Sequence, residues 1–150
     1  MRAASSHRVS AHATILLVDD NRDGTLARRS VLEELGYKIV SADCGSEALK
    51  IAAAHEFDLV ITDFKMSPVD GIELIKRLRE QDFRKPIILL TGFAESVGMR
   101  PETTGADAVI QKSANEITAL VRHTKRLLNT PRKPAGSQRG NSASRTQSKS

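Results

Sequence analysis

Short runs of apolar residues, each bounded by polar or turn-forming residues, recur along the chain and indicate buried strands. Between them lie stretches of about 10 to 14 residues with apolar residues at helical spacing, which is the length that a crossover between parallel strands requires. This alternation predicts an α/β fold with a parallel sheet. The predicted strands are TILLV from Thr14, the less apolar KIVSA from Lys38, DLVIT from Asp58, PIILL from Pro86 and AVI from Ala108.

The first three predicted helices have clear helical periodicity. The first covers about residues 23–35 and should end before Gly36, because glycine readily adopts the left-handed conformation that closes a helix. The next two cover about residues 46–55 and 71–80, where apolar residues recur on one face. The apolar residues of the first helix are Leu26, Val31, Leu32 and Leu35.

The helices on either side of the last strand differ in the strength of their signals. Residues 94–104 should form a short, bent or partly melted helix, because Gly98 and Pro101 disfavour a helix interior by about 1 and 3 kcal/mol. After the strand, Ser113 and Glu116 have the spacing of a capping box, which predicts the start of the last helix. An apolar stripe of that helix is expected to pack on the core: Ile117, Leu120, Val121, Leu127 and Leu128.

Composition changes this picture mainly at the two ends of the chain. The 150 residues fit one domain, and 39% of them are apolar. The formal net charge is +5, but seven of the 23 basic residues lie in residues 1–13 and 130–150, which contain none of the 18 acidic residues. Both ends are poor in large apolar residues, so we expect a disordered N-terminal arm and a disordered basic tail. Residues 14–129 are then the folded domain.

Several classes of protein are excluded or disfavoured by what the sequence lacks. No apolar run approaches the roughly 18 residues needed to cross a bilayer, and the first residues lack the apolar stretch of a secretory signal. The single Cys44 cannot form an internal disulfide. With four Phe, one Tyr and no Trp, an aromatic platform for single-stranded nucleic acid is disfavoured. We expect a cytoplasmic protein without a membrane partner.

Polar side chains follow the predicted strands where these should leave the core. Asp19 and Asp20 follow the first strand, and Asp63 follows DLVIT. Thr91 follows PIILL, and Lys112 follows AVIQ. Because ligands of a parallel α/β sheet bind at the carboxyl ends of its strands, these five side chains are expected at one rim of the sheet.

The chemistry of this set points to phosphoryl transfer. Three converging carboxylates repel one another, and a bound cation resolves that repulsion. Carboxylate oxygens favour Mg²⁺, with Mn²⁺ as the alternative. Asp19 and Asp20 would hold the metal, and Asp63 would be the nucleophile that accepts the phosphoryl group. Thr91 would donate a hydrogen bond to one phosphoryl oxygen, and Lys112 would neutralise another.

Over about residues 14–128 the sequence closely resembles the receiver domain of two-component response regulators. The resemblance rests on LLVDD, on ITDFKMSPVDG around Asp63, on LLTG with Thr91 and on GADAVIQK ending in Lys112. It implies a flavodoxin-like, doubly wound sheet of five parallel strands in the order 2-1-3-4-5, with helices on both faces. It also implies that a histidine kinase or a histidine phosphotransfer protein phosphorylates Asp63, and that the carbonyl of Lys65 joins the aspartates around Mg²⁺.

The resemblance implies a phospho-acceptor that switches its protein partners, and not an enzyme. The downstream partner cannot be identified from the sequence. We expect the receiver to act alone, because residues 130–150 are too few for an output domain.

Three residues depart from the family's usual pattern. Ser67 stands where a proline often follows the methionine, and Val109 stands where an aromatic residue usually rotates as a switch. Ser113 replaces the proline that usually follows the lysine through a cis bond. We predict a trans bond between Lys112 and Ser113, because a cis bond without proline costs about 2.5 to 4 kcal/mol.

Three other interpretations stay open. A phosphohydrolase with an aspartate nucleophile would usually carry a second acid two residues later, where Lys65 stands. A receiver-like scaffold that no longer switches would be compatible with Val109 and with the interrupted helix over residues 94–104. Binding of nucleic acid through the basic tail rests on charge alone.

Overall fold

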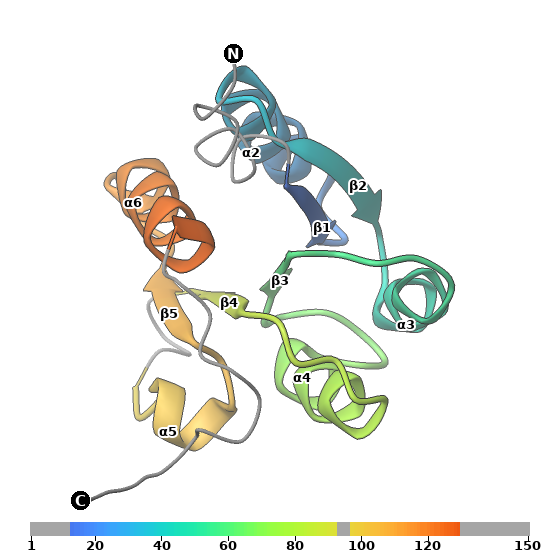
Figure 1. The fold of residues 1–150 in the computed structure, drawn as a ribbon. Helices are drawn as coiled ribbons and strands as arrows, with labels where there is room; N and C mark the ends of the chain where they lie inside the picture. The colour runs from blue at the N-terminus through green and yellow to red at the C-terminus, as the bar shows by residue number, and fades with distance from the viewer. Residues whose placement is uncertain (1–12, 93–96, 130–150) are drawn as a thin grey trace, which may run out of the picture.

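Five parallel strands form one sheet in the order β2-β1-β3-β4-β5, with helices on both faces (Figure 1). The structure is a computed structural model that describes residues 13–92 and 97–129. The architecture and strand order are those that the family resemblance implied. The strands are β1 (Thr14–Val18), β2 (Lys38–Ala42), β3 (Leu59–Asp63), β4 (Ile87–Thr91) and β5 (Ala108–Gln111). The helices are α2 (Arg22–Glu34), α3 (Gly45–Ala54), α4 (Gly71–Glu80), α5 (Pro101–Thr104) and α6 (Glu116–Asn129).

Ala13, the last residue of the predicted N-terminal arm, packs with the described part of the domain. Ala13 is buried, and its carbonyl accepts a hydrogen bond of 2.9 Å from the backbone N–H of Lys38. The rest of the two segments predicted to be disordered lies outside the described residues. Within the ranges that the structure describes, no helix combines the length and the apolar character needed to span a bilayer.

The alternation of side chains along the strands divides the core into two layers. Helices α2 and α6 cover one face of the sheet, and α3, α4 and α5 cover the other (Figure 1). In β1, Ile15 and Leu17 belong to the first layer, whereas Leu16 and Val18 belong to the second. All four side chains are fully buried, as expected for a parallel sheet that is covered on both faces.

The register of the strands brings their carboxyl ends to one rim. The last registered pair between β1 and β3 is directly followed by Asp19, just past the end of β1, and by Asp63, the last residue of β3. Strand β4 ends at Thr91, whose carbonyl accepts a hydrogen bond of 2.8 Å from the backbone N–H of Lys112. The sheet therefore delivers residues that are far apart in the sequence to one edge.

Helix α2 ends at the predicted glycine, but one of its apolar residues is not in the core. Gly36 has a φ of 101°, the left-handed conformation expected after the helix. Leu26, which the apolar pattern grouped with this helix's core residues, is 59% exposed, whereas Leu32 is fully buried. At 3.6 residues per turn, the separation between Leu26 and Leu32 places their side chains on different sides of the helix.

Helix α6 begins at Glu116 without the predicted capping box. The hydroxyl of Ser113 accepts a hydrogen bond of 3.2 Å from the backbone N–H of Asn115. The carboxylate of Glu116 does not reach back to Ser113 but contacts Arg28 of α2 at 2.5 Å. In the structure, the contact with the buried guanidinium takes the place of the predicted cap, and it joins two groups of opposite charge.

The segment before β5 is as irregular as expected. Its helix, α5, spans only Pro101–Thr104 and ends at Gly105, which has a φ of 82°. Residues 94–96 of the predicted helical segment lie outside the described residues.

The peptide bonds in the loops after β3 and β5 differ in conformation. Among the residues that the structure describes, one peptide bond is cis, the bond between Ser67 and Pro68. The bond between Lys112 and Ser113 is therefore trans, as predicted.

Candidate functional site

Three carboxylates meet at the carboxyl ends of β1 and β3. Asp19, Asp20 and Asp63 each offer one oxygen, and these oxygens lie within 4.8 Å of one another. Asp19 and Asp63 are each only 3% exposed, whereas Asp20 is exposed to solvent. The structure thus brings together the three acidic residues that the sequence predicted for a metal site.

Lys112 lies against the central carboxylate of this cluster. Its Nζ is 2.5 Å from Oδ1 of Asp63, and the two side chains are 31% and 5% exposed. The same Oδ1 is buried and accepts no hydrogen bond of good geometry from any residue that the structure describes. The ion pair therefore leaves Asp63 with acceptor capacity that a cation can use.

The environment of Asp63 disfavours its charged form. Burial raises the pKa of the Asp63 carboxyl, the contact with Lys112 offsets part of this rise, and the charge of Asp19 adds to it, while Arg28 opposes it. The sequence predicted repulsion among the carboxylates at this rim, but burial is the larger cause of the shift. A bound cation would favour the ionised form that nucleophilic attack requires.

Thr91 and Lys65, the other predicted site residues, lie on β4 and in the loop after β3. Thr91 is fully buried, and among the residues that the structure describes its hydroxyl contacts the carbonyl of Gly92 at 3.5 Å. That distance is at the limit of hydrogen bonding, so the hydroxyl can donate to a closer acceptor. Lys65 is exposed, and the role of its carbonyl as a metal ligand stays a prediction.

Arg28 is the site residue that the sequence analysis missed. Its Nη1 lies 2.5 Å from Oδ2 of Asp19, and its Nε lies 2.5 Å from Oε2 of Glu116. Burial alone would lower the pKa of Arg28, but Glu116 and Asp19 raise it above its ordinary value. The signal that could have revealed it was an arginine at helical spacing from Leu32 and Leu35, on an otherwise apolar face.

The residues of this rim fit Mg²⁺. Their donors are carboxylate oxygens, which this hard cation prefers. The Oδ1 atom of Asp63 is also buried without a directional hydrogen bond from the described residues. Lys112 and Arg28 contact two of the three carboxylates, Asp63 and Asp19. The pocket therefore keeps a net negative charge that attracts a cation.

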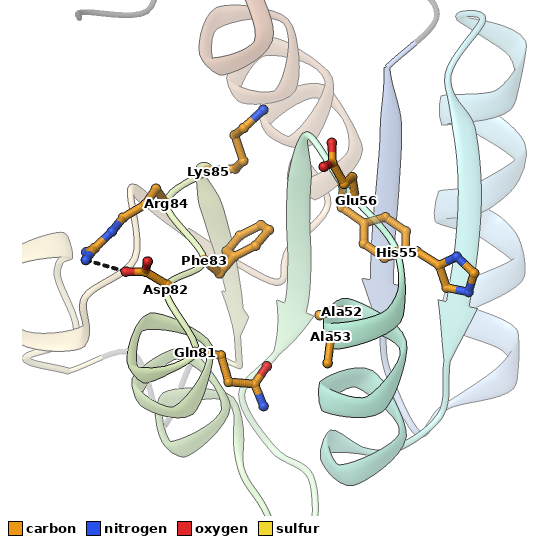
Figure 2. A pocket seen from close by; sticks show the side chains of 10 residues that line it. Ala52, Ala53, His55, Glu56, Gln81, Asp82, Phe83, Arg84 and Lys85 are labelled. Atoms are coloured by element: carbon orange, nitrogen blue, oxygen red, sulfur yellow. Dashed lines mark hydrogen bonds and ion pairs between the residues drawn. The ribbon is translucent and has the colours of Figure 1, made fainter. Parts of the chain in front are cut away.

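A shallow hollow of about 660 Å³ lies at the opposite ends of the strands (Figure 2). It is lined by the end of α3 and by the loops that precede β3 and β4. Three of its charged side chains pair with neighbours: Asp82 contacts Arg84 at 2.6 Å, and Lys85 contacts Asp58 at 3.6 Å. These charges do not converge on a ligand, so the acidic rim is the better candidate for chemistry.

Comparison with known proteins agrees with the geometry of the rim. The family model of the response regulator receiver domain matches residues 15–123. The alkaline phosphatase synthesis transcriptional regulatory protein PhoP of Bacillus subtilis is 36% identical over 114 residues, which cover 72% of this chain and 46% of that protein. The response regulator receiver protein CpdR of Brucella abortus is 32% identical over 115 residues, which cover 76% of this chain and 95% of that protein.

Solved structures show the same fold. The response regulator TrrA of Thermotoga maritima, in complex with Mg(2+)-BeF, matches with a TM-score of 0.65 at 32% identity, over 75% of this chain and 98% of that one. The chain spans less than half the length of several curated relatives that it matches, PhoP among them. The match to the family model, together with CpdR, shows that the chain belongs to the family of response regulator receiver domains of two-component systems.

Proposed function

We propose that the chain accepts a phosphoryl group on Asp63 from a histidine kinase or a histidine phosphotransfer protein, and that this modification changes its protein partners. The observation that carries the proposal is the convergence of Asp63 with Asp19, Asp20 and Lys112 at one rim. Asp63 would accept the phosphoryl group, Asp19 and Asp20 would hold the metal, and Lys112 would neutralise a phosphoryl oxygen. Among the described residues, no other cluster combines a buried carboxylate with a lysine at 2.5 Å.

In the transfer, a carboxylate oxygen of Asp63 bonds to phosphorus while the bond from phosphorus to the donor's imidazole nitrogen breaks. The electron pair of that bond leaves with the imidazole, which takes up a proton. Lys112 would neutralise one phosphoryl oxygen, and the hydroxyl of Thr91 would donate a hydrogen bond to another. Mg²⁺ held by the three aspartates, with the carbonyl of Lys65, would neutralise charge on the transferred group.

The chain would act as a phosphorylated switch and not as an enzyme that turns over a separate substrate. The residue two positions after Asp63 is the exposed Lys65, so the second acid typical of aspartate-nucleophile phosphohydrolases is missing from that position. Mn²⁺ in place of Mg²⁺, and a cytoplasmic location, stay predictions. The basic tail lies outside the described residues, so binding of nucleic acid through it is untested.

Phosphorylation by acetyl phosphate, followed by intact-mass spectrometry of the full chain, tests the proposal. One phosphoryl group should be added in the presence of Mg²⁺ and none after chelation of the metal. Asp63→Asn should abolish the addition. Asp82→Asn is the matched control, since Asp82 is 80% exposed and lines the hollow at the opposite ends of the strands from the rim. Its φ of 72° is one that asparagine adopts readily.

Two outcomes would contradict parts of the proposal. Undiminished labelling of Asp63→Asn would show that Asp63 is not the acceptor. Labelling of Asp63 without any change in amide chemical shifts beyond the rim would favour the alternative, a receiver-like scaffold that does not switch. The partly buried Val109, which has no ring to rotate, is the feature that keeps this alternative open.

A further inference from the structure

A buried arginine connects the acidic rim to the start of α6. Arg28 of α2 contacts Asp19, which follows β1, through Nη1, and it contacts Glu116, the first residue of α6, through Nε. The exposed fractions of the three side chains are 7%, 1% and 13%. Because the two contacts use different nitrogens of one planar guanidinium, Arg28 holds both carboxylates at the same time.

The backbone of α2 leaves room for this guanidinium. A Cβ atom on Gly24 would lie 2.9 Å from Nη1 of Arg28 and 3.2 Å from Oδ2 of Asp19. Glycine weakens a helix by about 1 kcal/mol relative to alanine, yet here it supplies the space in which the pair lies. The other oxygen of Asp19, Oδ1, accepts a hydrogen bond of 2.9 Å from the backbone N–H of Asn21. Both oxygens of Asp19 therefore have partners within the chain.

We propose that Arg28 is a positioning residue of the metal pocket: its ion pair with Asp19 opposes Mg²⁺ binding, and Glu116 weakens this opposition by sharing the same guanidinium. The inference rests on the proposed function, since it takes the rim to be the Mg²⁺ site. Coupling between two sites is reciprocal. If Glu116 sets the Mg²⁺ affinity of the pocket, Mg²⁺ binding must in turn change the environment of Glu116 at the start of α6.

The two partners of Arg28 should therefore affect metal affinity in opposite directions. Removing the positive charge of Arg28 leaves Asp19 unpaired and the pocket more negative, so Mg²⁺ should bind more tightly. Removing the negative charge of Glu116 leaves the guanidinium to Asp19 alone, so Mg²⁺ should bind more weakly. For charges this close to a partly buried site, changes of about three- to tenfold in the dissociation constant are expected. A pair that served only to hold α2 against α6 would not produce opposite signs.

The experiment is a Mg²⁺ titration of the full, ¹⁵N-labelled chain, followed by the backbone amide shifts of the rim and of Glu116. The variants are Arg28→Gln, Glu116→Gln and the double variant. Arg77→Gln and Glu33→Gln are the controls. They remove a positive and a negative charge, as Arg28→Gln and Glu116→Gln do, but from exposed i,i+4 pairs on helix surfaces. The amide spectrum of each variant also shows whether it is folded. If Arg28→Gln does not fold, Arg28→Lys keeps the charge but lacks the planar fork that binds the two carboxylates through separate nitrogens, so Mg²⁺ affinity should depend less on Glu116 in that background.

The expected result is tighter binding for Arg28→Gln, weaker binding for Glu116→Gln, and no change for the two controls. In the Arg28→Gln background, Glu116→Gln should have little effect, because the residue that transmits its influence is absent. The amide of Glu116 should shift with Mg²⁺ in the natural chain and not in Arg28→Gln.

Each of the remaining outcomes would contradict the inference. If Glu116→Gln changes the Mg²⁺ dissociation constant equally with and without Arg28, then Glu116 acts only through the electric field of its charge. The inference would then be wrong, although the Mg²⁺ site would stand. Changes of the same sign in both single variants would also overturn it. If the natural chain does not bind Mg²⁺ at the rim at all, the proposed function fails and this inference fails with it.

Discussion

Replacing Asp20 by asparagine should stabilise the metal-free protein. The substitution removes one of three like charges whose oxygens lie within 4.8 Å of one another, and it keeps the shape of the side chain. Two unit charges at 4.8 Å repel by about 3.5 kcal/mol at an effective dielectric constant of 20 and by about 0.9 kcal/mol in water. Asp20 is exposed, and Lys112 and Arg28 already balance its neighbours, so the smaller value applies. We expect a gain of about 1 kcal/mol in the free energy of unfolding.

Mg²⁺ should reverse the order of the two proteins. Binding to the folded state alone stabilises the natural chain by about 1.4 kcal/mol when free Mg²⁺ is ten times its dissociation constant. Asp20→Asn lacks one of the carboxylate ligands, so the same Mg²⁺ concentration should stabilise it less. The natural chain should therefore equal or exceed the variant in stability once the metal is saturating.

The assay is urea denaturation at neutral pH, followed by circular dichroism, with Mg²⁺ and with a chelator. Asp82→Asn serves as the control, because it removes an exposed carboxylate outside the acidic cluster and should change stability little. If Asp20→Asn is less stable than the natural chain in the chelator, local hydrogen bonds stabilise this carboxylate, and the reasoning from charge repulsion is refuted.

The pH dependence of stability gives an independent check on the same pocket. Burial raises the pKa of Asp63 in the folded state, the contact with Lys112 opposes this rise, and the charge of Asp19 adds to it. A carboxyl with a raised folded pKa binds more protons in the folded state, so its contribution to stability grows as pH falls. That contribution is complete below the unfolded pKa of about 3.9 and is lost as pH rises through the folded pKa of Asp63. The difference in stability between the natural chain and Asp63→Asn should follow this direction, and a difference that is constant with pH would contradict it.

Three further predictions concern other parts of the chain. Gly71→Ala should lower the free energy of unfolding by about 1 to 3 kcal/mol in urea denaturation, because its Cβ would lie 2.5 Å from the carbonyl oxygen of Asp63 and 2.8 Å from Cα of Phe64; an unchanged midpoint would show that the loop moves freely. Deleting residues 131–150 should leave the thermal midpoint and the phosphorylation of Asp63 unchanged, and a large fall in the midpoint would contradict the predicted disorder of the tail. If the chain signals without an aromatic at position 109, phosphorylation should alter hydrogen exchange in residues 97–104, whose short helix is easily rearranged; identical exchange before and after phosphorylation would exclude this segment as the switch.

The sequence by itself determined the strands to within one residue at their ends, and the positions of the acidic rim. Runs such as TILLV are apolar on both faces, which is possible only for strands covered on both sides, and the observed β1 agrees with that run residue by residue. The rim could be predicted because a parallel sheet aligns the carboxyl ends of its strands. The residue after each apolar run must therefore lie at that one edge of the sheet. Asp19, Asp63, Thr91 and Lys112 follow from this rule without any knowledge of side-chain contacts.

Only the tertiary structure decided which partners the buried charged side chains near the rim have. Local spacing assigned Glu116 to a cap on its own helix, yet its carboxylate pairs with Arg28, which is 88 residues away in the chain. That pairing depends on α2 and α6 lying on the same face of the sheet, a consequence of the strand order β2-β1-β3-β4-β5. A local pattern records which groups are near in sequence, whereas a buried charge takes the strongest partner near it in space. For this reason the sequence predicted the carboxylates of the rim but not the arginine between them and α6.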